Sequence, residues 1–376
     1  MSDDLRNYWY KNLGVRPVIN AGGNTTLWGG STSSIKVRQA MEESSDNYVE
    51  MDELMQNSGH YIATMLGVEN AYVTSGCAAA MILSAAACMA GVDPKKTASL
   101  PSTTGMKNEI VFQKQQQYPY QRMFSVPGSE LVLVGDDKQC TVDQLYDAIN
   151  PNTAAVAYVY HSELYQSNLT IEEVVRVAHS KDVPVIVDAA GQVYPLDRFT
   201  RIAQAADLVC FGAKYFGAPH STGVVCGRGD LIQSVAAQGF IGFETGGRRS
   251  LGRGYKVDRQ EIVGEVAAMD EWFSLDHEER ILDYGAKLNI IQRSLDLIPK
   301  VFTEIRRYDS HYQIGLHISF DNSDVDNIHS LSGSLLEGNP RIRVRVDDDN
   351  TIAIIPHTLN HGEESIIASR LTDILS

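Results

Sequence analysis

Three strand-like runs in the sequence end on residues that could do chemistry. The first run turns through Ser75 and Gly76 into an alanine-rich helix, the second (VPVIV) delivers Asp188, and the third (ADLVCFGA) delivers Lys214. Ligands of open α/β sheets lie beyond the carboxyl ends of the strands. We therefore expect the three endings to meet at one site.

The first ending suits a phosphate group. Backbone N–H groups at the start of a helix lack partners within the helix, and the helix dipole favours an anion there. The candidate donors around this turn are Thr74, Ser75, Gly76 and Cys77. An ordinary strand–helix turn with a serine cap explains the same residues equally well.

The second ending places a carboxylate after four apolar residues. A buried carboxylate is costly unless a cation or hydrogen-bond donors meet it. The protonated nitrogen of a pyridine ring is such a partner for Asp188. A carboxylate that caps the following turn is the alternative.

The third ending places Lys214 among small residues. A lysine that forms an imine needs a partly desolvated amine, so that its neutral form is accessible near pH 7. A single lysine in a loop is ordinarily a solvated surface charge. The ordered set of phosphate turn, Asp188 and Lys214, with the last two separated by 26 positions (214 − 188), favours the catalytic interpretation.

Strand-like and helix-like runs alternate through the middle of the chain. This rhythm predicts an α/β fold with a large, doubly wound, mostly parallel sheet. After residue 258 two long helices precede strands at 312–320, 341–347 and 351–357, which predicts a smaller α+β domain. The expected division is an N-terminal arm (1–48), a large domain (49–258) and a C-terminal domain (259–376).

Composition narrows the possible partners. The chain has 376 residues, 43% of them hydrophobic, and a net charge of −15 without an evident basic stripe, which disfavours nucleic acid. Five cysteines without a C-x-x-C pair predict reduced thiols and neither a disulfide framework nor a metal site. The polar N-terminus and the short longest apolar run predict a cytoplasmic protein without a membrane span.

The sequence resembles the fold type I pyridoxal-phosphate enzymes, and within them the branch of bacterial selenocysteine synthase and the D-glucosaminate-6-phosphate ammonia-lyases. The matching segments are LGVRPVINAGG, YVTSGCAAA, KNEIVFQ, VPVIVDAAG, FGAKYFGAPHSTGVVCGR, YKVDRQEIVGEVAAMDEW and PRIRVRVDDDNTIAIIPHTL. They extend over residues 12–359, so the resemblance covers most of the chain.

The resemblance implies pyridoxal 5'-phosphate as the cofactor and a role for each matching residue. Lys214 becomes the Schiff-base lysine and proton shuttle, and Asp188 the partner of the pyridine nitrogen. Gln192 becomes a candidate contact to the ring's 3'-oxygen, and Arg345 the arginine for the substrate carboxylate. The implied phosphate cup consists of Ser75, Gly76 and Cys77, with Thr74 as an extra donor.

Arg345 belongs to an alternating strand in which Arg341, Arg343 and Arg345 share one face. An exposed edge strand protected by charge is the alternative interpretation of the three arginines.

Three departures from the family pattern point to a different substrate. His357 stands where the family has a second arginine, and Gln115, Gln116 and Gln117 replace its G-H-R segment. A glycine- and arginine-rich insert precedes Lys256.

The resemblance favours β-elimination, of the ammonia-lyase type, on a hydroxy- or sugar-derived amino acid. A racemase or epimerase and an aldolase are the alternatives, because they use the same carbanion. A tRNA-dependent selenium transferase is disfavoured by the charge, and a non-catalytic binding protein by the presence of both Asp188 and Lys214. A dehydrogenase is disfavoured because TSGCAA lacks the dinucleotide-binding glycines. The resemblance also implies a homodimer.

Overall fold

The computed structural model describes residues 8–160, 168–245, 249–308, 313–320, 326–348 and 350–376. The chain forms two compact units. One consists of Ser31–Ser274, and the other combines Met1–Gly30 with Leu275–Ser376.

A seven-stranded sheet forms the centre of the unit Ser31–Ser274. Its strands are β2 (Asn70–Thr74), β3 (Glu109–Gln113), β4 (Glu130–Val134), β5 (Thr153–Val159), β6 (Val185–Asp188), β7 (Leu208–Gly212) and β8 (Gly223–Gly227). The order is β2-β8-β7-β6-β5-β3-β4, and β8 runs in the direction opposite to that of the other six strands. The expected mostly parallel sheet is thus confirmed, and its seven strands all fall in runs that the sequence predicts.

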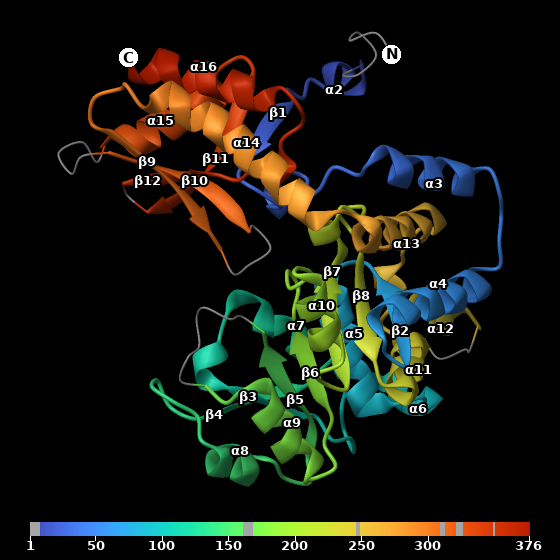
Figure 1. The fold of residues 1–376 in the computed structure, drawn as a ribbon. Coiled ribbons are helices and arrows are strands. Elements are labelled where there is room, and N and C mark those ends of the chain that lie inside the picture. The colour runs from blue at the N-terminus through green and yellow to red at the C-terminus, as the bar shows by residue number, and fades with distance from the viewer. Residues whose placement is uncertain (1–7, 161–167, 246–248, 309–312, 321–325, 349) are drawn as a thin grey trace. The chain divides into compact units, whose positions relative to one another are not determined.

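Helices pack on both faces of this sheet (Figure 1). The helices of this unit are α3 (Ile35–Ser45), α4 (Met51–Leu66), α5 (Cys77–Ala90), α6 (Pro94–Ser99), α7 (Arg122–Ser125), α8 (Val142–Ala148), α9 (Ile171–His179), α10 (Leu196–Ala203), α11 (Gly229–Gln238), α12 (Phe240–Thr245) and α13 (Arg259–Ser274). The short 3-10 turns are η2 (Lys114–Gln116), η3 (Pro119–Gln121), η4 (Ala213–Phe216) and η5 (Arg253–Tyr255). Helix α5 is almost entirely buried, because its alanines let the backbone lie close to β5–β8.

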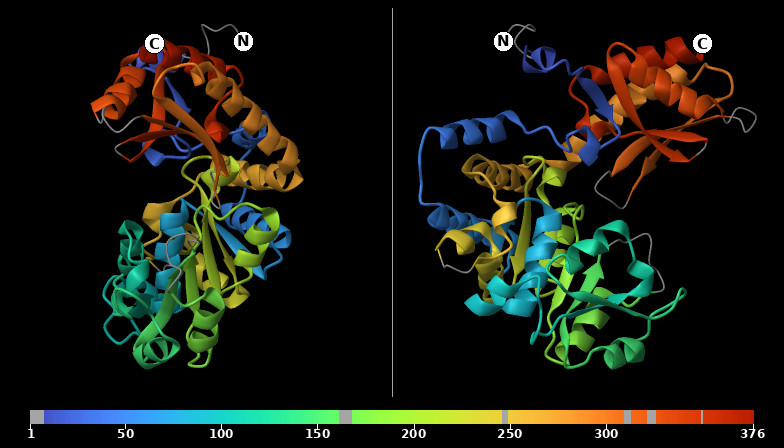
Figure 2. Two further views of the ribbon diagram at one scale, coloured as in Figure 1. Left: turned by 60° about the vertical axis from the view of Figure 1, so that its left-hand side comes forward. Right: turned by 180° about the vertical axis from the view of Figure 1, so that it is seen from behind.

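The second unit contains a five-stranded sheet. Its strands are β1 (Val18–Ala21), β9 (Val301–Arg307), β10 (Ile314–Phe320), β11 (Arg341–Asp348) and β12 (Thr351–Ile354), in the order β1-β11-β12-β10-β9. Its helical elements are α2 (Tyr8–Asn12), η1 (Thr26–Trp28), α14 (His277–Leu295), α15 (Asp326–Glu337), η6 (Pro356–Thr358) and α16 (Glu363–Leu375). Helices α14, α15 and α16 cover one face of the sheet, as both views in Figure 2 show, and share a hydrophobic core with it.

The units divide the chain differently from the expected boundaries at residues 48 and 258. Strand β1 pairs in parallel with β11, with Val18 opposite Arg341, so the start of the chain belongs to the second unit. Helix α13 packs against α3 and α4 and therefore belongs to the first unit. Sequence periodicity predicts elements but not these long-range partners.

No helix within the described ranges is long and apolar enough to cross a membrane. The five cysteines are free thiols.

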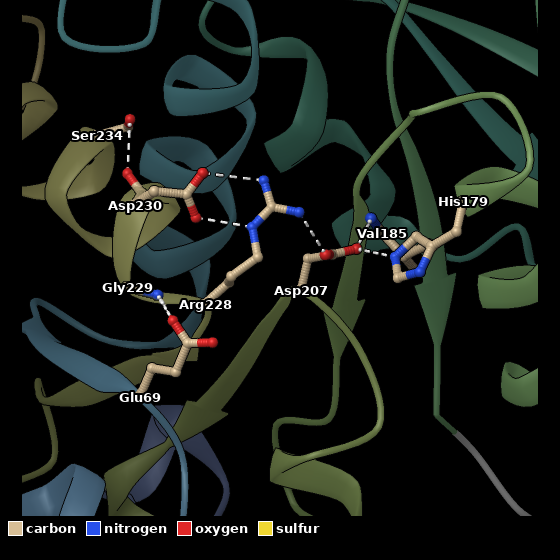
Figure 3. Close-up of polar contacts among 8 residues, drawn as sticks. All are labelled: Glu69, His179, Val185, Asp207, Arg228, Gly229, Asp230 and Ser234. Carbon is tan, nitrogen blue, oxygen red and sulfur yellow. Dashed lines mark hydrogen bonds and ion pairs between the residues drawn. The ribbon is translucent and has the colours of Figure 1, made fainter.

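The buried carboxylate of Asp207 joins the starts of β6 and β7 to the end of β8 (Figure 3). Asp188 is the last residue of β6 and therefore lies at the opposite ends of these strands. Asp207 accepts hydrogen bonds from Val185 N (2.8 Å) and Arg228 Nη1 (2.9 Å). Its Oδ2 also lies within hydrogen-bond distance of His179 Nε2 (2.8 Å). Its side chain is only 4% exposed. These contacts make Asp207 a structural clamp between three neighbouring strands.

We expect Asp207→Ala to lower the free energy of unfolding by about 2–3 kcal/mol, because it leaves the buried Val185 N–H without an acceptor. Asp230→Ala is the matched control, since Asp230 pairs with the same Arg228 but is 65% exposed; its cost should be at most about 1 kcal/mol. The urea midpoints of both variants measure the difference. Equal urea midpoints for Asp207→Ala and Asp230→Ala would contradict the structural role of Asp207.

Candidate active site

The carboxyl ends of β6 and β7 bring the two predicted chemical residues close together. The strands are parallel neighbours, with Asp188 opposite Cys210. Lys214 follows four residues after Cys210, in the turn η4. The start of α5 completes the group, because Cys77 Sγ lies 3.4 Å from Asp188 Oδ1. The structure therefore assembles the three strand endings at one site.

Asp188 is 7% exposed and is held by neutral donors from three segments. Oδ1 accepts from the Cys77 thiol and from Ala190 N (3.0 Å), and Oδ2 accepts a short hydrogen bond from the Tyr118 hydroxyl. Burial, followed by the nearby charge of Asp188, raises the pKa of both Cys77 and Tyr118. Both groups therefore keep their protons and act as donors, and neither neutralises the negative charge of Asp188.

The turn into α5 has the backbone conformation of an anion site. Gly76 caps the helix with φ 91°, which an L side chain rarely adopts. Gly223 on β8 allows the turn to approach closely, since a Cβ there would lie 2.7 Å from Cys77 N. The first helical hydrogen bond runs from Ala80 N to Gly76 O, so the N–H groups before Ala80 have no partner within the helix.

Two of the predicted phosphate donors have different surroundings. The Ser75 hydroxyl has no hydrogen-bond partner among the described residues, which fits a donor to an anion. Thr74 is buried, and its Oγ1 lies 2.9 Å from Gly223 O and 3.0 Å from Gly76 O. The proton of Thr74 is thus used within the turn, and the side chain of Cys77 points to Asp188.

Lys214 has the environment that an imine-forming amine needs. Burial lowers its pKa, and the neighbouring Cys77 opposes this only in part. His220 lies in the segment that leads into β8. Burial lowers the pKa of His220, and the nearby charge of Lys214 lowers it further. A lower pKa makes the neutral amine of Lys214 more accessible at neutral pH.

Gln192 contributes a buried acceptor beyond the end of β6. It is 6% exposed, and its Oε1 has no hydrogen-bond partner among the described residues. A buried polar atom of this kind indicates a missing ligand group.

The structure shows the surroundings of two residues that depart from the family pattern, Gln116 and His357. Gln116 is fully buried and holds the end of β5, with its amide bonded to Val159 N (3.1 Å) and Val159 O (3.2 Å). His357 contacts Asn24, and burial, followed by the charge of Arg280, lowers the pKa of His357 to about 3. The imidazole is therefore neutral, so the positive charge that the family pattern has at this position is absent.

Arg345 lies in the other unit, on β11, where its Nε is 2.5 Å from Asp347 Oδ1. Its role with the substrate carboxylate stays a prediction.

Sequence reasoning missed two groups at the site. Tyr118 follows a run of three glutamines and reaches Asp188 from 70 positions away. His220 stands six residues after Lys214, in a segment noted only for its resemblance. A polar aromatic residue just after a strand is a weak signal, and only the folded chain shows its partner.

A model of the aminotransferase class-V family matches residues 31–249. The chain belongs to this family. It is 33% identical, over 80% of its length and 74% of the relative, to 5'-C-glycyluridine monooxygenase-decarboxylase of Streptomyces sp.. It is 28% identical, over 97% of both chains, to D-glucosaminate-6-phosphate ammonia lyase of Salmonella typhimurium. A solved D-glucosaminate-6-phosphate ammonia-lyase superposes with a TM-score of 0.84 at 27% identity and covers 98% of each chain.

These findings confirm the resemblance and the expected fold type, and the cofactor of this class-V family member is pyridoxal 5'-phosphate. The residues present fit it. The turn at Gly76 offers backbone N–H groups to the phosphate, Asp188 offers a buried carboxylate to the ring nitrogen, and Lys214 offers an amine of lowered pKa. The orphaned Oε1 of Gln192 fits a group that brings a proton.

Helix α13 carries a buried acid behind the Lys214 turn. Glu265 is 0% exposed, and burial, followed by the charge of Glu261, raises its pKa from 4.5 to about 8. The Thr222 hydroxyl is near enough to Glu265 to oppose this shift, but its proton goes to Pro219 O (2.9 Å). Neither carboxylate oxygen of Glu265 has a hydrogen-bond partner within the described part of the chain. Glu265 is therefore protonated in the folded protein at neutral pH.

We expect Glu265→Gln to stabilise the protein increasingly between pH 5 and pH 8. In that range the unfolded chain has lost the Glu265 proton while the folded chain keeps it, so the wild type loses about 1.4 kcal/mol per pH unit as the pH rises. The loss is absent below pH 4.5 and complete above pH 8. Urea midpoints measured across this range test the slope.

Glu271→Gln is the control, because Glu271 lies on the same helix and accepts a hydrogen bond from Ser34 Oγ (2.6 Å). Its effect should not grow with pH. A pH-independent difference between wild type and Glu265→Gln would show that Glu265 is ionised when folded.

Proposed function

We propose that this protein is a pyridoxal-phosphate-dependent ammonia-lyase that acts at the α-carbon of a hydroxy- or sugar-derived amino acid. The observation that carries the proposal is the similarity to D-glucosaminate-6-phosphate ammonia lyase along 97% of both chains. The assembly of Asp188, Lys214 and the Gly76 turn supports it.

The bound cofactor withdraws electrons from the α-carbon of the amino acid. Asp188 strengthens this pull by keeping the ring nitrogen protonated, and its two neutral side-chain donors, Cys77 and Tyr118, hold the carboxylate in place. Lys214 Nζ is the base that would take the Cα proton of the bound substrate. His220 lies beside it and is neutral at physiological pH because its pKa is lowered.

The overall reaction balances without an external oxidant. The Cα–H bond breaks and its proton goes to Lys214 Nζ, and the Cβ–O bond breaks with loss of water. Hydrolysis of the released enamine then gives ammonia and a 2-oxo acid. One water leaves and one enters, so the net change is removal of ammonia.

A second candidate is an oxygen-dependent decarboxylase. It is favoured by the 33% identity to 5'-C-glycyluridine monooxygenase-decarboxylase. This reaction would start with the same substrate attachment but would consume dioxygen and release carbon dioxide.

We also propose a homodimer in the cytoplasm. The homodimer is supported by the family resemblance, and the location by the five free thiols.

Borohydride reduction of the holoenzyme should fix the cofactor on the peptide that contains Lys214, as detected by mass spectrometry. We expect Lys214→Ala to abolish this label and to reduce turnover by about 10³-fold or more, because the variant loses both the attachment point and the Cα base. Lys138→Ala, in an exposed turn, is the control and should behave as wild type. A label on another lysine would overturn the assignment.

A panel of D- and L-amino acids, D-glucosaminate and D-glucosaminate 6-phosphate, assayed with and without dioxygen, separates the candidates. The lyase should release ammonia and a 2-oxo acid equally well in both conditions. Release of carbon dioxide only with dioxygen would favour the decarboxylase. Exchange of the Cα proton with solvent without ammonia would point to a racemase, and release of an aldehyde to an aldolase.

A further inference from the structure

The loop between β7 and β8 carries an imidazole as well as Lys214. Ala213 N donates to Thr222 O (3.0 Å), and Ala218 N donates to Ala213 O (3.2 Å), so the loop is closed on itself. Lys214 and His220 both lie inside this closed segment. The backbone therefore holds the two residues in one compact turn of the chain, within a single unit.

Helix α13 fixes the residues on either side of His220. Ser221 Oγ donates a short hydrogen bond to Glu261, and a Cβ at Gly264 would lie only 3.0 Å from Pro219 Cγ. Glu261 and Gly264 are three positions apart (264 − 261) and therefore share a face of the helix. His220 is thus held through both of its neighbours, Pro219 and Ser221.

The same loop packs against the turn that is suited to a phosphate. Ser221 O lies 3.6 Å from the position of a Cβ at Gly76, and a Cβ at Gly223 would lie 2.7 Å from Cys77 N. These close approaches place the segment before β8 beside the start of α5. His220 therefore lies in a segment that joins the phosphate turn to the lysine loop.

The His220 side chain has no structural partner in the described part of the chain. It is half-buried and makes no hydrogen bond and no ion pair with the described residues. Burial, followed by the charge of Lys214, lowers the pKa of His220, so the imidazole is neutral at physiological pH. A neutral imidazole accepts a proton on one nitrogen and releases one from the other. It can therefore pass a proton between two groups.

The carboxylates of α13 that meet this loop do so at other residues. Glu261 accepts from Ser221, and Glu265 is fully buried beside Thr222. The charge that acts on the imidazole of His220 is that of Lys214.

The proposed β-elimination needs a proton at the leaving oxygen. Hydroxide is a poor leaving group, and a positioned side chain that protonates it typically accelerates such a step by about 10²–10⁴-fold. Lys214 receives the Cα proton, while Cys77 and Tyr118 give theirs to Asp188. Tyr215 turns the face of its ring to Lys214 Nζ, which lies 5.1 Å from the ring centre. Among the described side chains beside Lys214, the loop imidazole is left to deliver the proton.

We propose that His220 relays the Cα proton from Lys214 Nζ to the oxygen that leaves Cβ. One imidazole nitrogen accepts the proton from Nζ, and the other donates its own proton to the oxygen. The electron pair of the Cα–H bond forms the Cα=Cβ bond, and the pair of the Cβ–O bond stays on the oxygen. The Cα hydrogen is thus accounted for in the released water, and both side chains return to their starting forms. The inference rests on the proposed function, because a β-elimination creates the leaving hydroxyl.

Ammonia release from serine and from β-chloroalanine, each as its D and L enantiomers, tests the relay in the holoenzyme. We expect His220→Gln to slow release from serine about 10²-fold or more, because the hydroxyl then leaves without a proton donor. Release from β-chloroalanine should stay close to the wild-type rate, because chloride departs without a proton. An equal loss with both compounds, or no loss with serine, would overturn the inference.

Exchange of the Cα proton of serine in deuterium oxide separates the relay from a structural role. His220→Gln keeps Lys214, so Cα exchange should persist while ammonia release falls. Exchange that falls in parallel with ammonia release would show that His220 only supports Lys214, which contradicts the relay. A selective loss of serine turnover in Tyr215→Phe but not in His220→Gln would assign the proton to Tyr215 and also overturn the inference.

The coupling of the two residues is measured without any substrate. NMR of the holoenzyme with labelled histidine, followed across pH, gives the pKa of His220, and the spectrum of His220→Gln assigns its signal. We expect Lys214→Met to raise this pKa, because it removes the positive charge beside the imidazole. Lys138→Met is the control and should leave the pKa of His220 unchanged. The same pKa in wild type and Lys214→Met would contradict the coupling on which the relay depends.

The proposed function and the relay can fail separately. Absence of ammonia from every amino acid of the panel would contradict the lyase, and the NMR titration would still decide whether Lys214 and His220 are coupled. Ammonia release that is insensitive to His220→Gln would contradict the relay alone.

Discussion

The active site depends on one buried carboxylate, that of Asp188 at the end of β6. Burial of a carboxylate is unfavourable unless donors replace its water. The described donors come from the start of α5, from the segment after β3 and from the turn after β6, as Cys77, Tyr118 and Ala190 N. The hydrogen bonds that Asp188 accepts therefore link the segments around the cofactor site.

A second buried carboxylate, that of Asp207, lies at the opposite ends of the same strands. The different partners of Asp207 and Asp188 explain the different roles of the two residues. Asp207 is compensated by the charge of Arg228 and is structural. The side-chain donors described around Asp188 are a thiol and a phenol, whose raised pKa values keep them neutral. These two donors hold the carboxylate of Asp188 without neutralising it.

The second unit is built from both ends of the chain. Strand β1 pairs with β11, and the turn after β1 seats Trp28 under Arg343. Of the arginines that the strand pattern places on one face, Arg345 has a carboxylate partner and Arg343 has an aromatic one. This difference in partners separates two residues that look equivalent in the alternating pattern.

Short-range patterns in the sequence alone determined the seven strands of the large sheet and placed Asp188, Lys214 and the Gly76 turn at strand ends. The alternation and the strand-end residues are local, so no tertiary information was needed. Tertiary structure alone decided that Tyr118 donates to Asp188, that β1 joins the C-terminal sheet and that Asp347 pairs with Arg345 while Arg343 does not. Except for the Asp347 pair, these contacts join residues far apart in the chain, and periodicity carries no information about which distant segments meet. Even within β11, the different partners of Arg343 and Arg345 depend on where Trp28 and Asp347 lie in the folded unit.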